Sequence, residues 1–370
     1  MRVTVEQASL ARALSQTTRV VAPQNTLPVL SGVELTAQGQ SLHLYATDLT
    51  TALEADVPAE VSEPGHIVLP AGTLTDLIQR LPTALVDIAA ETSAQAVIRY
   101  GRNQATIHGF AEDRLPEFAH LPRNAAVAVT IPGHVLAEVA RQVLFACARD
   151  EARPILKGVA MELGEGRLVF AATDGSRLSQ VWYAVPDHLE APRQWVWPAK
   201  AVTEASRLTA GLDTVTLWMS PHVVQLETAG FRLTSRLLEG QYPEYQRVIP
   251  QQYVAECRVE LSALRGAVER VNLIAQKDRS ASLRIVHEPG MLELGTVSQD
   301  IGHAREVVEC QSTGQPLDLL FNPHFIADVL KSLSSAEIVV EFAGTQSPAR
   351  FREVGGSTYQ HILLPLRQLV

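Results

Sequence analysis

The sequence contains an internal repeat with a period close to 126 residues, and this repeat constrains the fold more than any other feature. Four short segments recur in the same order at offsets of 126 to 128 positions. The pairs are residues 27–33 with 153–159, 46–49 with 172–175, 68–71 with 196–199, and 115–118 with 242–245. Matches in one order at nearly one spacing indicate duplicated structural units.

A third copy of the same unit follows with weaker similarity. Residues 259–261 match residues 3–5 and 129–131, and a proline ends each of the first two copies, at Pro122 and Pro250. At roughly 100–200 residues per domain, a chain of 370 residues accommodates three domains. We therefore predict domains at residues 1–124, 125–253 and 254–370.

Hydrophobic periodicity predicts the same elements in each copy. Apolar residues at helical spacing predict one helix after the opening strand, with Leu10 and Leu14, and a second helix with Leu74 and Ile78. Short alternating segments separated by turn-forming residues predict strands over most of the remainder. We predict an α+β fold of three tandem copies of one domain, each with two helices packed on about eight strands.

The composition is that of an ordinary globular protein, with 46% hydrophobic residues and a mean hydropathy of +0.06. No segment approaches the ~20 apolar residues of a membrane helix, and we expect no secretory leader. The three cysteines, Cys147, Cys257 and Cys310, lie far apart without metal-ligand spacing. We therefore expect free thiols and a cytoplasmic location.

The formal net charge of −9 bears on nucleic-acid binding. A nucleic-acid-binding protein usually presents a basic face, so an acidic chain is not an obvious candidate. Net charge does not show where the charges lie, however, because an acidic outer surface around a basic inner surface gives the same total. Charge alone therefore leaves DNA binding open.

No recognisable catalytic or cofactor-binding motif is present in the sequence. Residues 164–167 (GEGR) lack the third glycine of a dinucleotide-binding fingerprint and fit a hairpin turn. The eleven histidines form no close ligand pair. Asp48 and Asp174 recur at equivalent positions, which favours a turn-forming role. We predict no enzymatic activity, cofactor or metal; the alternative is an enzyme whose site is assembled from distant residues.

Along essentially its whole length, the chain resembles the bacterial beta sliding clamp family. The segments that carry the resemblance are 26–30 (TLPVL), 46–49 (ATDL), 153–158 (RPILKG), 172–178 (ATDGSRL), 238–250 (LEGQYPEYQRVIP) and 362–367 (ILLPLR). Their joint order in a three-copy chain of this length is specific. The resemblance implies three domains of one fold and a head-to-tail homodimer that closes into a six-domain ring.

The same resemblance implies a processivity factor that encircles double-stranded DNA and tethers the replicative polymerase. DNA polymerase subunits, a clamp loader and repair proteins would bind through short linear motifs. A few long cations on helices would contact phosphates without gripping them tightly. The candidates are Arg12, Arg19, Arg141, Arg149, Lys200, Arg207, Lys277, Arg279 and Lys331. Each of them could instead lie on a solvated helix face.

The first copy departs from the family pattern in its expected DNA contacts. Gly72 and Thr73, and likewise Gln24 and Asn25, stand where family members often carry basic residues. A clamp-like protein-binding scaffold with little DNA function is therefore the alternative.

The resemblance also implies a groove for partner peptides between the second domain and the C-terminal segment. The matching residues are Arg153, Leu156, Thr173, Gly175, Ser176, Arg177, Leu178, Pro243, Arg247, Val248, Ile362, Leu364, Pro365, Leu366 and Arg367. An apolar cleft with cationic edges suits a peptide with aliphatic or aromatic anchors. Ser176 stands where some members have histidine, so the peptide preference is expected to differ. Burial in the core is the alternative explanation for the apolar members.

The ring would close where the first domain of one subunit meets the third domain of the other. By position, the apolar candidates for this joint are Ile107, Leu273 and Ile274. For each of them, burial within its own domain is the alternative.

Overall fold

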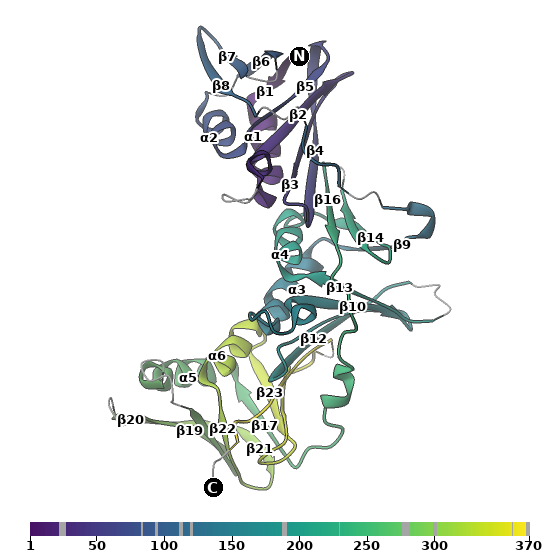
Figure 1. Ribbon diagram of the computed structural model, residues 1–370. Helices are drawn as coiled ribbons and strands as arrows, with labels where there is room; N and C mark the ends of the chain where they lie inside the picture. The colour runs from purple at the N-terminus through teal and green to yellow at the C-terminus, as the bar shows by residue number, and fades with distance from the viewer. Residues whose placement is uncertain are drawn as a thin grey trace. The chain divides into compact units, whose positions relative to one another are not determined.

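The protein forms two compact units in the computed structural model (Figure 1). One unit comprises Met1–Leu136 and Lys200–Leu237, and the other comprises Ala137–Ala199 and Leu238–Val370. The residues that the structure describes are 1–21, 27–82, 84–92, 95–110, 114–118, 121–186, 191–228, 230–275, 282–298, 302–356 and 358–367.

The order of helices and strands repeats three times along the described chain. The first copy comprises β1 (Arg2–Glu6), α1 (Gln7–Thr17), β2 (Gly32–Gln38), β3 (Ser41–Thr47), β4 (Thr51–Glu63), β5 (Gly65–Pro70), α2 (Ala71–Arg80), β6 (Leu85–Thr92), β7 (Gln95–Tyr100) and β8 (Asn103–His108). The second comprises β9 (Val127–Pro132), α3 (His134–Gln142), β10 (Gly158–Gly164), β11 (Arg167–Thr173), β12 (Arg177–Ala184), β13 (Arg193–Pro198), α4 (Ala199–Leu208), β14 (Thr214–Met219), β15 (Val223–Glu227) and β16 (Phe231–Arg236).

The third copy follows the same order with one additional strand. It comprises β17 (Ala255–Glu260), α5 (Leu261–Ala275), β18 (Leu283–Glu288), β19 (Met291–Ser298), β20 (Gly302–Glu309), β21 (Gln311–Gly314), β22 (Leu317–Phe321), α6 (Pro323–Ser332), β23 (Glu337–Phe342), β24 (Ala349–Glu353) and β25 (Tyr359–Leu363). Two helices and eight or nine strands per copy confirm the predicted α+β fold of three tandem units.

Strand pairing repeats together with element order. The opening strand of each copy pairs antiparallel with the strand that follows the second helix: β1 with β6, β9 with β14, and β17 with β23. The second strand likewise pairs with the third in every copy, as β2 with β3, β10 with β11, and β18 with β19. One fold is therefore used three times, as the sequence offsets predicted.

Two antiparallel pairings join successive copies. The fourth strand of the first copy, β4, pairs with the last strand of the second copy, β16. The fourth strand of the second copy, β12, pairs in the same way with the last strand of the third, β25. The resulting sheets run across the predicted domain boundaries, so the two compact units follow sheets and do not coincide with the three repeats.

The helices are amphipathic and bury one face within their own unit. In the first unit α1 packs against α2 and β4 (Figure 1), and its residues Leu10 and Leu14 are fully buried. In the second, α5 packs against α6, β19 and β20. The start of α6 is fixed by Asn322, whose side chain accepts a hydrogen bond from the backbone N–H of His324, and by Pro323 in the first turn.

Candidate functional site

A groove of about 170 Å³ opens in the second unit, beside the ends of β12 and β25. Its walls include all the residues predicted for the partner-peptide groove except Arg247, Pro365, Leu366 and Arg367. They come from four separated stretches of the chain. The structure therefore brings together residues that the sequence could group only through family resemblance.

One wall of the groove is the turn between β11 and β12. The hydroxyl of Thr173 accepts the N–H of Gly175 at 3.0 Å and donates to the carbonyl of Arg177 at 2.6 Å. The Asp174 carboxylate accepts the backbone N–H groups of Ser176 at 2.9 Å and Arg177 at 3.1 Å. These bonds pair the backbone polar groups of the turn with side chains of the turn itself. The turn therefore needs no further chain segment packed over it, and the groove beside it stays open.

Gly175 suits this turn by its backbone conformation, although Leu49 adopts a similar positive φ of +70° at the equivalent position of the first copy. The φ of Gly175, +92°, lies in the left-handed region, which is unfavourable for residues with a Cβ atom. A Cβ atom there would also lie 2.8 Å from Nη1 of Arg153, whose guanidinium donates to the Asp174 carbonyl at 2.6 Å. Arg153 is exposed and provides a positive charge at the rim.

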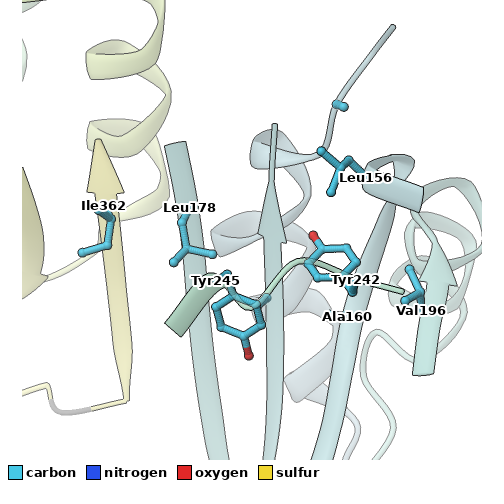
Figure 2. Close-up of a cluster of buried hydrophobic side chains, with 9 residues drawn as sticks. Leu156, Ala160, Leu178, Val196, Tyr242, Tyr245 and Ile362 are labelled. Atoms are coloured by element: carbon cyan, nitrogen blue, oxygen red, sulfur yellow. The ribbon is translucent and has the colours of Figure 1, made fainter. Parts of the chain in front are cut away.

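The floor of the groove is apolar. Leu178 and Ile362 lie opposite each other in register across β12 and β25, and Figure 2 shows Leu178 between Ile362 and Tyr245, all three in one buried cluster. Tyr242 packs edge-on against Tyr245, and its hydroxyl accepts the N–H of Thr173 at 3.1 Å. This bond ties the apolar floor to the polar turn.

Two apolar side chains at the groove remain open to solvent. Val248 is 50% exposed and Leu364 is 40% exposed, although both line the cavity. The core alternative therefore applies to Leu178, Ile362 and Leu156, which are almost fully buried, but not to Val248 or Leu364.

Arg177 is buried beneath the groove and is fully paired. Its guanidinium donates to Asp174 at 2.9 Å, to Asp328 of α6 at 2.8 Å and to the carbonyl of Phe145. It also lies 4.1 Å from the ring centroid of Phe325. Since its charge is neutralised by two carboxylates, Arg177 positions the turn and does not add a free cation to the rim.

Four of the residues predicted to bind partner peptides do not line this cavity. Arg247 does not line the cavity; its side chain is 81% exposed and pairs with Glu244 at 2.5 Å. Pro365, Leu366 and Arg367 also lie outside the cavity walls, and the N–H of Leu366 donates to the carbonyl of Leu320 at 2.7 Å.

Three residues that line the groove were not predicted: Glu244, Tyr245 and Pro348. Glu244 and Tyr245 follow Pro243 directly in the segment 238–250, which carries the family resemblance, so their place in the chain could have suggested them. Pro348 immediately precedes β24, and only the β24–β25 pairing brings it to the groove. No local sequence signal predicts that placement.

Of the predicted DNA-contacting cations, those that the structure describes lie on helices or near a helix end, and most of them have a polar partner. Lys200 pairs with Asp48 at 2.5 Å, and Arg207 and Arg19 pair with Glu204 at 2.8 and 3.8 Å. Arg141 donates to the carbonyl of Ser332. Arg12, Arg149 and Lys331 are exposed, while Lys277 and Arg279 lie outside the described residues.

The candidates for the ring joint differ in exposure. Leu273 on α5 is 67% exposed and Ile274 is half-buried. Ile107 on β8 is only 7% exposed, because it packs within its own unit. Val307 on β20, which was not predicted, is 47% exposed.

A close serine–histidine pair and the possible metal ligands among the described residues bear on the enzyme alternative. Ser179 and His361 lie 2.6 Å apart, but both are fully buried and out of reach of a substrate. No group of three or more His, Cys, Asp or Glu residues among the described positions could hold a metal ion. No helix among them is long and apolar enough to cross a membrane.

Comparison with known proteins reveals similarity over the whole chain. Residues 1–122, 130–244 and 246–367 match the N-terminal, central and C-terminal domain models of the DNA polymerase III beta subunit. The beta sliding clamp of Bacillus subtilis is 29% identical, with 99% of this chain and 100% of the relative aligned. That of Staphylococcus aureus is 26% identical, with 99% of each aligned.

Solved structures show the same fold. The crystal structure of the DNA polymerase sliding clamp from Bacillus subtilis superposes with a TM-score of 0.94 at 27% identity, covering 100% of this chain and 99% of that one. The DNA polymerase III subunit beta from Pseudomonas aeruginosa superposes with a TM-score of 0.93 at 28% identity, covering 99% and 100%.

Proposed function

The chain belongs to the DNA polymerase III beta subunit family, the bacterial sliding clamps. We propose that its edge strands close a ring with a second chain, that its helices contact DNA, and that its groove binds partner proteins. The chain is a DNA sliding clamp, a processivity factor and not an enzyme. The family implies DNA, a DNA polymerase and a second copy of the chain as partners. The three repeats correspond to clamp domains at residues 1–124, 125–253 and 254–370.

The main support for a closed ring is the strand pairing that joins successive copies in the same way twice. In both joints, the fourth strand of one copy pairs with the last strand of the next. Within the described residues this rule leaves one strand of each kind without such a partner, β20 in the third copy and β8 in the first. Joining β20 of one chain to β8 of another extends the rule and closes two chains head to tail.

The surfaces beside these two strands are suited to that joint. Both are edge strands, which carry unpaired backbone donors and acceptors that a second chain can satisfy. Val307 on β20 is exposed, and Leu273 lies on α5, the helix that packs on β20. Apolar side chains beside an open strand edge favour association with another chain.

The charge distribution supports a role for the helices in DNA contact. Among the described residues, the helices α1 to α6 contain eight lysine and arginine residues against five aspartate and glutamate residues, a net charge of +3. Since the whole chain carries −9, the remainder carries −12. A positive set of helices on an acidic protein would draw DNA to the helices and keep it from the strands.

The groove is proposed to bind a short peptide of partner proteins. Its floor of Leu178, Ile362 and Tyr245 suits one or two apolar anchors, and the exposed Val248 and Leu364 extend that surface. Arg153 and Glu244 at the rim offer one positive and one negative contact. Polymerase subunits, a clamp loader and repair proteins, acting in the cytoplasm, are the proposed partners.

A DNA-retention experiment tests the ring. The protein is loaded by a clamp loader on nicked circular DNA, half of the sample is cut once with a restriction enzyme, and bound protein is followed by gel filtration. Retention on circles with loss from linear molecules is expected, because a closed ring slides off an open end. Equal retention on both forms would mean ordinary electrostatic binding, and no retention with an active loader would mean a scaffold without DNA function.

A further inference from the structure

We infer that Cys257 and Cys310 form a dithiol that peroxide oxidises reversibly to an intrachain disulfide. The pairing of β17 with β21 brings the two cysteines close enough for each thiol to affect the pKa of the other, although 53 positions separate them in the chain. This modification site belongs to the third copy alone and does not depend on the proposed function.

The pairing of β17 with β21 brings the two thiols together. Cys257 in β17 lies opposite Ser312 in β21, and Arg258 lies opposite Gln311. Because alternate residues of a strand point to the same face, Cys310, two positions before Ser312, is expected on the same face of the sheet as Ser312 and Cys257. The N–H of Cys310 donates to the carbonyl of Gly290 at 3.0 Å, which holds the corner between β20 and β21 in place.

The two cysteines differ in their access to solvent. This difference suits Cys310 to react first with an oxidant and Cys257 to react second, with the oxidised Cys310. Cys310 is half-buried and lines a surface depression of about 620 Å³ together with Glu309 and Gln311. Cys257 is fully buried. A small oxidant can therefore reach Cys310 first, and the only described thiol in contact with the oxidised sulfur is that of Cys257.

The hydrogen bonding of the pair assigns the same roles. The bond from Cys257 and a second bond from Ser312 lower the pKa of Cys310, although partial burial opposes this. The bond to Cys310, together with burial, raises the pKa of Cys257. Cys310 is thus the better thiolate and the better nucleophile, while Cys257 stays protonated.

The chemistry balances with hydrogen peroxide as oxidant. The Cys310 thiolate attacks one peroxide oxygen, the O–O bond breaks, and sulfenic acid and hydroxide form. The Cys257 sulfur then attacks the Cys310 sulfur, the S–O bond breaks, and water leaves with the thiol proton. Two thiols are oxidised to one disulfide, one peroxide is reduced to two waters, and a thiol reductant reverses the change.

Counting free thiols tests the inference on the full chain. The reduced protein is treated with hydrogen peroxide, quenched with catalase, denatured and alkylated, and the adducts are counted by mass spectrometry. We expect three adducts before treatment and one afterwards, with a linked peptide pair containing Cys257 and Cys310 that dithiothreitol separates. Cys147 serves as an internal reference, since burial raises its pKa to about 12 and it should remain unoxidised.

Variants separate a paired dithiol from unrelated oxidation of single thiols. In Cys310→Ser, both remaining thiols should stay reduced at the same peroxide dose. In Cys257→Ser, Cys310 should accumulate as a sulfenic acid that dimedone captures. Three remaining adducts in the treated wild type, loss of the Cys310 adduct without the linked peptide, or a link to Cys147 would each overturn the inference.

Discussion

His361 is a buried neutral histidine whose titration couples folding to pH. It is fully buried with Nδ1 2.6 Å from the hydroxyl of Ser179, and burial, helped by the positive charge of Arg177, lowers its pKa to about 3. The unfolded chain binds a proton near the ordinary pKa of 6.5, whereas the folded protein does not until about pH 3. The histidine therefore favours folding above pH 6.5, and that contribution is lost as the pH falls from 6.5 toward 3.

The predicted effect is a change in the slope of stability against pH. Between pH 6 and 4, His361 should contribute a loss of about 1.4 kcal/mol per pH unit, which His361→Asn removes. Urea unfolding of both proteins at several pH values measures this slope. Carboxylates add to acid unfolding in both proteins, so the comparison concerns the difference. Parallel curves for the two proteins would show that His361 titrates normally.

Gly175 provides a second residue-level prediction. Gly175→Ala should lower the free energy of unfolding by about 1–2 kcal/mol, because alanine is strained at φ +92° and its Cβ would press on Arg153. Gly72→Ala is the control, since Gly72 lies in helix α2 with no heavy atom near the added Cβ. That change should stabilise the protein by about 0.5–1 kcal/mol. Equal effects of the two substitutions in urea unfolding would contradict the assigned strain.

The turn residues Asp48 and Asp174 show which structural roles of a single residue could be predicted from the sequence and which could not. The recurrence of Asp48 and Asp174 predicted turn-forming carboxylates, and both accept backbone N–H groups of the following residues. Their ion-pair partners were not predictable. Asp48 pairs with Lys200 and Asp174 with Arg177, because tertiary packing chooses which cation reaches each turn.

At the level of elements, β12, β25 and the short helix Tyr245–Val248 form the groove, and its exposed apolar residues can be changed without disturbing the core. Val248→Asp and Leu364→Asp should each weaken binding of a polymerase-derived peptide at least about tenfold, equivalent to about 1.4 kcal/mol. Fluorescence anisotropy with a labelled peptide measures the affinity. Thermal unfolding should remain close to that of the wild type.

Val254→Asp is the matched control for these substitutions. Val254 is 41% exposed, similar to Leu364, but does not line the groove. It should leave peptide affinity unchanged. If all three aspartate variants bind like the wild type, the groove is not the peptide site.

Periodicity was sufficient to predict the helices and many strands, because each buries one face in a regular pattern. Leu74 and Ile78, predicted on one helix face, are both fully buried in α2. Periodicity could not predict the joints between copies. The pairing of Phe231 with Ala55 in β16 and β4 links residues far apart in the chain, and the same side-chain pattern suits many partners.

For the whole molecule, the main prediction concerns the proposed joint between chains. Leu273→Asp places a charge on an exposed apolar side chain of α5, and it should convert a dimer into monomers at micromolar concentration. Light scattering coupled to gel filtration measures the mass. Leu85→Asp is the control, because Leu85 is 64% exposed at the start of β6, which β7 separates from the edge strand β8. A dimer that survives Leu273→Asp would place the joint elsewhere.

The net negative charge of the chain was the sequence feature that said least about how the whole molecule contacts DNA. It could not reveal that the helices carry a positive excess, because that excess appears only when residues are assigned to elements. Even so, Lys200, Arg207 and Arg19 are engaged with carboxylates, which reduces the charge available to DNA.

The continuous sheets have a consequence for how the protein can be divided. A fragment of the middle third alone, residues 130–244, would lack β4, the partner strand of β16, and β25, the partner strand of β12. The fragment would then expose two open strand edges at once, and such edges recruit one another into aggregates. The three similar segments therefore repeat one fold but depend on strands of their neighbours, and because each compact unit is made of two separated stretches of chain, neither unit can be cut out as one continuous fragment.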